Sequence, residues 1–185
     1  MVDFVGAGCG AADLITLRGK RLIEQADVII YAGSLVNPEL LKYAKRGCEI
    51  HNSARMTLDE VISVIDIAEC SGRNTVRLHT GDPSLYGAIR EQMDRLDELG
   101  IEYSVCPGVS SFCGAAASLK AEYTLPDISQ TVIITRMAGR TTVPDSESIE
   151  ALSAHHSTMV IFLSAGMTGE LSRRLQQGGY PADTP

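Results

Sequence analysis

The chain has 185 residues, 44% of them apolar, and a net charge of −7, which suits one large globular domain or two small ones. An acidic chain offers no broad basic face for phosphates, so we expect no nucleic-acid binding. Its five cysteines, Cys9, Cys48, Cys70, Cys106 and Cys113, are spread without a C-x-x-C pair, which argues against a disulfide framework or a structural zinc site.

We also expect no signal peptide and no membrane span. The N-terminus runs directly into the strand-like segment Val2–Val5 and has neither the charged region nor the long apolar stretch of a signal peptide. The longest apolar runs, around Val28–Ala32 and Met159–Leu163, are too short to cross a bilayer. Together with the unpaired cysteines, these features predict a cytoplasmic protein.

Short apolar runs alternate with longer amphipathic ones through residues 1–120. The pattern predicts strands at Val2–Val5, Val28–Tyr31, Glu49–His51, Thr75–Thr80 and Tyr103–Cys106. It predicts helices at Leu14–Ala26, Pro38–Ala44, Thr57–Ser71, Leu85–Leu99 and Ser111–Leu119, the third opened by a capping box. Five β-α repeats of this kind predict an α/β domain with a parallel, doubly wound sheet.

Residues 121–185 predict a second, partial α/β domain. The composition predicts strands at Thr131–Arg136 and Thr158–Leu163. It predicts a loop at Met137–Glu147 and a helix at Thr168–Gln177. Two strands are marginal for independent stability, and the chain ends in loop composition where another strand is expected. We therefore suspect that the chain is a fragment.

Glycines follow the first strand, in Gly6-Ala7-Gly8-Cys9-Gly10. With Ala11 they match the dinucleotide pattern G-x-G-x-x-A, which calls for an acid at the end of the second strand. That strand instead ends in Tyr31-Ala32-Gly33-Ser34, and Asp27 precedes it. The nicotinamide interpretation is therefore disfavoured, and a simple connecting turn is another alternative.

Two further loops of small residues follow strands. The motif His79–Gly87 contains Asp82, which faces a ligand or caps the next helix. The motif Cys106–Phe112 leads into a small-residue helix, where close helix packing is the alternative. Ligands of open α/β sheets bind at the carboxyl ends of the strands, and all three loops are expected there.

Other catalytic patterns are weak. We find no Ser-His-Asp order, Walker loop or H-E-x-x-H, and no histidine has a second ligand at metal spacing, so we predict no metal site. Arginines pair with carboxylates through two parallel hydrogen bonds, although solvent exposure is the simpler explanation for most of them. The candidates are Arg55, Arg77, Arg90, Arg136 and Arg140.

Several motifs resemble those of the tetrapyrrole (precorrin) methylases. They are Val5–Gly10 with Asp13–Thr16, Ala26–Tyr31, Tyr31–Asn37, Leu78–Gly87, Pro107–Phe112 and Thr124–Pro126. Tyr31–Asn37 and Leu78–Gly87 are similar to the branch that methylates carbon 11 of precorrin-4 in cobalamin synthesis, with or without cobalt. The resemblance covers essentially the whole chain.

The resemblance implies two domains, a ligand cleft between them, S-adenosylmethionine as methyl donor, a tetrapyrrole substrate, no metal in the transfer, and a homodimer. Carried over by position, the cofactor contacts fall on Thr80, Gly81, Asp82, Leu85, Ser110, Ser111 and Leu163. The substrate cleft is expected at Gly6, Gly8, Cys9, Gly10 and Tyr86.

Four positions depart from the family pattern. Cys9 stands where proline is usual, and Ala11 and Ala12 stand where Asp-Pro is usual. Ala32 replaces the aspartate of some siblings, so no catalytic acid is assigned. The alternatives are another precorrin methylase, diphthine synthase, or a truncated cofactor-binding module without catalysis.

Overall fold

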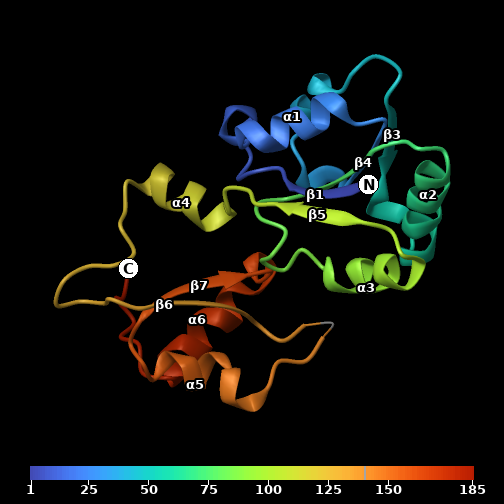
Figure 1. Ribbon diagram of the computed structural model, residues 1–185. Coiled ribbons are helices and arrows are strands. Elements are labelled where there is room, and N and C mark those ends of the chain that lie inside the picture. Colours follow the sequence, from blue (N-terminus) through green and yellow to red (C-terminus); the bar gives the residue numbers. More distant parts are fainter. Residues whose placement is uncertain (140) are drawn as a thin grey trace. The chain divides into compact units, whose positions relative to one another are not determined.

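The computed structural model describes Met1–Gly139 and Thr141–Pro185 (Figure 1). The chain forms two compact units, Met1–Ser118 and Leu119–Pro185, and each is described separately. None of the helices in these described ranges combines the length and apolarity that a membrane crossing needs.

The first unit is built on a sheet of five parallel strands in the order β3-β2-β4-β1-β5. The strands are β1 (Val2–Gly6), β2 (Val28–Tyr31), β3 (Glu49–Asn52), β4 (Thr75–His79) and β5 (Tyr103–Cys106). The α/β class and the parallel sheet predicted from the sequence are confirmed. Because all the strands run the same way, the loops after β4, β1 and β5 emerge side by side at one edge.

Apolar layers cover both faces of this sheet. Helix α1 (Leu17–Gln25) and the 3₁₀ helix η3 (Pro38–Tyr43) pack on one face, through Ile23 and Leu40. Helices α2 (Leu58–Cys70) and α3 (Arg90–Leu99) pack on the other, through residues such as Ile65 and Leu96 (Figure 1). Alternate strand residues supply each core, so the sheet is doubly wound.

Local signals explain most helix ends. The Thr57 side chain accepts from the Glu60 amide while Glu60 reaches back to Thr57, the predicted capping box. Gly100 ends α3 in the left-handed conformation (φ 67°), which glycine adopts without strain. Short 3₁₀ helices, η1 (Ala12–Leu14), η2 (Gly33–Leu35) and η4 (Ser53–Arg55), lie in the connections.

Two predicted helix starts are wrong. The helix predicted from Leu85 begins at Arg90, because Tyr86 (φ 55°) and Ala88 (φ 50°) are left-handed and break helical geometry. The helix predicted from Leu14 begins at Leu17, where Thr16 caps it by accepting from the Gly19 amide.

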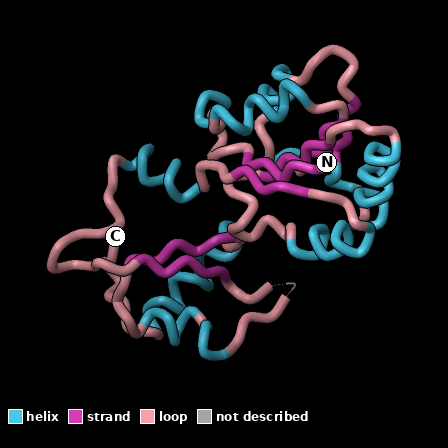
Figure 2. The backbone as a smooth tube through the Cα atoms, viewed as in Figure 1, coloured by secondary structure: helices cyan, strands magenta, loops and turns pink. Residues whose placement is uncertain are grey.

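The second unit contains the parallel pair β6 (Val132–Arg136) and β7 (Thr158–Phe162), with α6 (Thr168–Gln177) after η6 (Ala165–Met167) (Figure 2). The sequence missed the short helix α5 (Ile149–Ser153), capped by Ser148, and η5 (Asp145–Glu147). Helix α4 (Ser111–Leu119) follows β5, and its last residue belongs to this second unit.

Candidate functional site

The loops after β1 and β4 are joined backbone to backbone. The Gly8 amide donates to the Gly81 carbonyl (3.2 Å) and the Gly81 amide donates to the Gly8 carbonyl (2.9 Å). Both glycines have positive φ, 81° and 56°, a region that side chains rarely tolerate. This reciprocal pair extends the sheet edge beyond β4 and fixes the two loops together.

Gly108, after β5, completes the junction. A Cβ on Gly6 would lie 2.6 Å from both Gly108 Cα and the Gly81 carbonyl oxygen. A Cβ on Gly108 would overlap the same carbonyl oxygen and lie 2.8 Å from Gly6 Cα. The three backbones therefore touch directly, and the absence of side chains is what permits it.

Asp82 ties this junction to its own loop. Its carboxylate accepts from the Gly108 amide (2.9 Å), the Ser84 amide (2.8 Å) and the Ser84 hydroxyl (2.5 Å). Partial burial opposes ionisation, but these hydrogen bonds outweigh it and lower the pKa of Asp82. The helix-cap alternative is wrong, because α3 begins eight residues later without a side-chain cap.

Replacing Asp82 by alanine should cost about 1–3 kcal/mol of stability, because two amides lose their acceptor. We expect weaker binding of S-adenosylhomocysteine, because the Gly108 loop is released. Chemical denaturation and calorimetry measure the two effects. The exposed Asp66→Ala on α2 is the control, and Asp82→Ala with unchanged affinity would remove this residue from the site.

The amino end of α4 lies against Gly81. A Cβ on Gly81 would be 3.6 Å from the Ser111 nitrogen and 3.6 Å from Ser110 Cα. Ser110 is buried and Ser111 exposed. The free amides and dipole of a helix amino end favour a ligand group that accepts hydrogen bonds.

Cys9 and Gly10 make further links around the first loop. A Cβ on Gly114 of α4 would be 2.8 Å from Cys9 Sγ, so the thiol packs against this helix. Asn37 Nδ2 donates to the Gly10 carbonyl (2.8 Å), which joins this loop to the segment before η3. The sequence reasoning missed Asn37 and Gly108; their positions before Pro38 and after Pro107 were the available turn signals.

The remaining candidate residues lie farther apart along the chain, in the loop after β4 and after β7. Thr80 and Leu85 are half-buried in the loop after β4, and Tyr86 is exposed there in a strained left-handed conformation. Leu163 belongs to the second unit, where it follows β7 with φ 57° and a 72% exposed side chain. The first unit therefore contains every cofactor-contact and substrate-cleft candidate except Leu163.

Asp27, the acid considered for a ribose hydroxyl, has a structural role. It lies before β2, at the amino edge, where it pairs with Lys45 Nζ (2.6 Å) and accepts from the Asn74 amide. The hydrogen bond from Lys45 and that from the Asn74 amide lower the pKa of Asp27. It therefore cannot serve a dinucleotide at the carboxyl edge.

Three of the candidate arginines already have protein partners. Arg77 is buried in β4 and donates to Gln92 Oε1 (2.9 Å) and the Ile30 carbonyl (3.1 Å), so the expectation that it holds a substrate carboxylate is wrong. Arg136 donates to the carbonyls of Met137, Thr141 and Thr142. Arg90 is paired with Asp94, Arg55 is exposed, and Arg140 lies outside the described residues.

His79 is a residue that the sequence analysis did not single out. It ends β4, is 4% exposed, and its Nε2 is buried without a hydrogen-bond partner in the described part of the chain. Burial, and then the charge of Arg77, lower the pKa of His79 to about 3. The imidazole is therefore neutral at the end of β4, immediately before the loop that carries Thr80 and Asp82.

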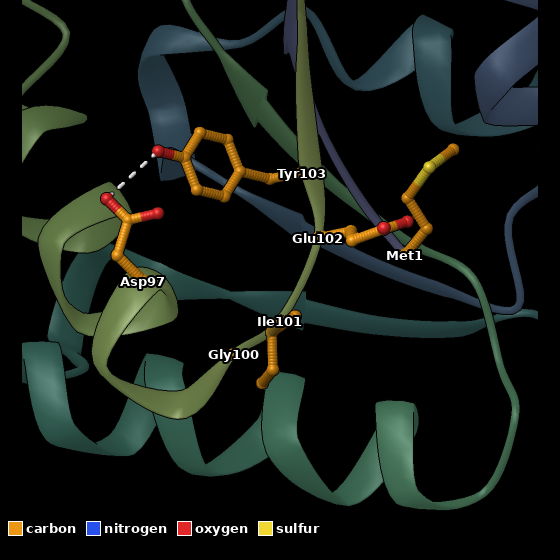
Figure 3. A pocket seen from close by; sticks show the side chains of 6 residues that line it. All are labelled: Met1, Asp97, Gly100, Ile101, Glu102 and Tyr103. Carbon is orange, nitrogen blue, oxygen red and sulfur yellow. Dashed lines mark hydrogen bonds between the residues drawn. The ribbon is translucent and has the colours of Figure 1, made fainter.

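Two hollows lie away from this edge of the sheet. One, of about 460 Å³, is at the amino end of the sheet and is lined by Met1, Asp97, Gly100, Ile101, Glu102 and Tyr103 (Figure 3). Another, of about 580 Å³, lies in the second unit beside Met159, Leu175 and Tyr180. Within the described ranges no group of His, Cys, Asp and Glu side chains is placed to bind a metal ion.

Comparisons with known proteins show the family of this chain. Residues 1–185 match the family model of the Tetrapyrrole (Corrin/Porphyrin) Methylases. The chain is 55% identical over 184 residues to a Methanocaldococcus jannaschii protein named cobalt-precorrin-4 C(11)-methyltransferase. The match covers 100% of this chain and 71% of that protein. It is 44% identical over 185 residues to a Mycobacterium tuberculosis precorrin-4 C(11)-methyltransferase, covering 100% of this chain and 74% of that one.

A solved structure is also similar. It is described as a cobalamin biosynthetic enzyme, cobalt precorrin-4 methyltransferase, and is 43% identical. It superposes with a TM-score of 0.95 over 99% of this chain and 77% of that one.

Proposed function

Because this chain belongs to the tetrapyrrole methylase family, we propose that it transfers a methyl group from S-adenosylmethionine to carbon 11 of precorrin-4 in corrin-ring synthesis. The observation that carries the proposal is the glycine junction of Gly6, Gly81 and Gly108 at the carboxyl edge of the sheet, in a chain similar throughout to C11-methyltransferases. Relatives named for the cobalt-containing and for the cobalt-free substrate are both similar to this chain, so the proposal covers both forms of precorrin-4.

The residues at this edge fit an adenosyl ligand. The glycine backbones after β1 and β4 pack against each other and place no side chains at this edge, and Ser110 and Ser111 add hydroxyls at the amino end of α4. We assign cofactor contacts to Thr80, Gly81, Asp82, Leu85, Ser110, Ser111 and Leu163. We assign the substrate side to Gly6, Gly8, Cys9, Gly10 and Tyr86.

In the reaction, the chain's own residues act by positioning. When bound, the cofactor supplies an electrophilic methyl group, so no protein nucleophile is needed. Alignment of donor and acceptor is then the main requirement, and rigid loops reduce the entropy lost in reaching it. Asp82 holds Ser84 and Gly108, and the Gly8–Gly81 pair holds the first loop, so the edge is organised before ligands arrive.

Two further parts of the proposal rest on family resemblance and composition: a homodimer and a cytoplasmic location. The five cysteines are all free, which suits a reducing compartment. Sedimentation of the pure protein would report the oligomeric state.

Calorimetric titration with S-adenosylhomocysteine, and with NAD as control, tests the proposal first. We expect saturable binding of the adenosyl ligand and none of NAD. Binding of NAD alone would contradict the proposal. Incubation with S-adenosylmethionine and cobalt-precorrin-4, followed by mass spectrometry, then separates an enzyme from a cofactor-binding module, because only an enzyme adds the mass of a methyl group.

A further inference from the structure

The two helical layers of the first unit carry opposite charge. Helix α1 and the segment 38–46 have six basic and two acidic side chains, whereas α2 and α3 have eight acidic and two basic ones. These layers lie on opposite faces of the sheet (Figure 1). An acidic chain therefore presents one locally basic face, which attracts anions.

Within this basic face, three arginines, Arg18, Arg21 and Arg46, have no ion-pair partner among the described residues, and the first two lie together on α1. The lysines are paired: Lys20 with Glu24, Lys42 with Glu39, and Lys45 with Asp27. Arg18 and Arg21 are exposed on α1, and neither has an ion-pair partner in the parts of the chain that the structure describes. Residues three apart on a helix lie on the same side, so the two guanidinium groups share one surface.

The basic face begins at the candidate site. Helix α1 starts at Leu17, and a Cβ on Gly8 would lie 3.0 Å from the carbonyl oxygen of Leu14, three residues earlier, so the glycine loop contacts the segment that leads into this helix. The Leu17 side chain, next to Arg18, is 74% exposed. An apolar side chain beside two free guanidinium groups suits a ligand with an apolar body and a carboxylate rim.

We infer that Arg18 and Arg21 dock the carboxylates of the tetrapyrrole substrate, with Leu17 against its apolar ring; this inference rests on the function proposed above. A polycarboxylate is repelled by a chain of net charge −7, so a local cationic surface next to the site is required to capture it. Arg77 and Arg136 cannot provide it, because their donors are occupied.

The test uses fluorescence to measure how tightly the full chain binds uroporphyrin, a porphyrin polycarboxylate. The variant is Arg18→Glu with Arg21→Glu. The control is Arg90→Glu with Arg95→Glu on α3, which changes net charge equally on the acidic layer, where Arg90 is exposed, Arg95 is half-buried and both are ion-paired. Calorimetry with S-adenosylhomocysteine is run on all three proteins.

We expect the α1 variant to bind uroporphyrin about tenfold or more weakly at low salt, with the difference shrinking near 1 M salt, where charges are screened beyond about 3 Å. The α3 control should bind uroporphyrin better than the α1 variant, and all three should bind S-adenosylhomocysteine equally. Conversion to lysine at both α1 positions should restore part of the affinity, since charge returns without the planar fork.

Equal uroporphyrin affinity of the wild type and the α1 variant would overturn this inference alone, provided that S-adenosylhomocysteine binds. Equal weakening in both double variants would also overturn it, because net charge would then be the cause. A loss of self-association in the α1 variant, with unchanged uroporphyrin binding, would assign the face to a second copy of the chain instead. A wild type that binds neither ligand would overturn the proposed function as well.

Discussion

Gly108→Ala is expected to destabilise the first unit by about 3 kcal/mol or more and to abolish binding of S-adenosylhomocysteine. The new methyl group would overlap the Gly81 carbonyl oxygen and press on Gly6 Cα at 2.8 Å. Both obstacles are backbone atoms, so no side chain can rotate away. Relief requires the loops after β1, β4 and β5 to separate, which breaks the Gly8–Gly81 hydrogen bonds and the contact from the Gly108 amide to Asp82.

Gly169→Ala is the matched control. This glycine lies in α6, and a Cβ there would meet no atom within 4 Å. Alanine favours helix over glycine by up to about 1 kcal/mol, so we expect unchanged or slightly higher stability. Urea denaturation and calorimetry compare the two variants. A Gly108→Ala protein as stable as Gly169→Ala, with intact ligand affinity, would show that the junction is not tight in solution.

The sequence alone predicted the location of this junction but not its contacts. A glycine-containing loop and then a helix follow each of the predicted strands Val2–Val5, Thr75–Thr80 and Tyr103–Cys106. Parallel strands bring such loops to one edge of the sheet. It could not predict that β4, β1 and β5 would be neighbours in that order, because pairing of distant strands leaves no local signal. The contact of Gly108 with Gly6 and Gly81 depends on that order.

Local predictions failed where tertiary contacts override helix propensity. Residues 85–89 continue the amphipathic pattern of α3, yet Tyr86 and Ala88 are left-handed. Asp82 was an ambiguous residue in the sequence; the structure gives its carboxylate three donors, one of them the Gly108 amide from a distant loop. Arg77 shows the reverse error, since its position inside a strand already argued for burial over ligand contact.

His79 leads to the other large effect, on the pH dependence of stability. Its Nε2 is buried without a partner in the described residues, next to the ring of Phe4 at 6.0 Å and on the same side of β4 as the buried Arg77. An apolar environment and a neighbouring cation both oppose protonation, so the folded chain holds this imidazole neutral down to a pKa of about 3. The unfolded chain protonates it near pH 6.5.

The free energy of unfolding should therefore fall as pH drops from about 6.5 towards 3, by roughly 1.4 kcal/mol per pH unit from this residue alone. The sign follows from proton binding: in that window the unfolded state takes up a proton that the folded state refuses, and above pH 6.5 neither binds it. Carboxylates add their own acid dependence, so the measurement is the difference between the wild type and His79→Leu in urea denaturation at several pH values.

The leucine variant should lose less stability on acidification, and because it removes an unpaired buried polar atom, its stability at pH 8 should stay close to wild type. The exposed His155→Leu is the control, with the wild-type pH profile expected. Parallel pH profiles for wild type and His79→Leu would mean that His79 is solvated or paired in solution, and that the loop above it is more open than the structure shows.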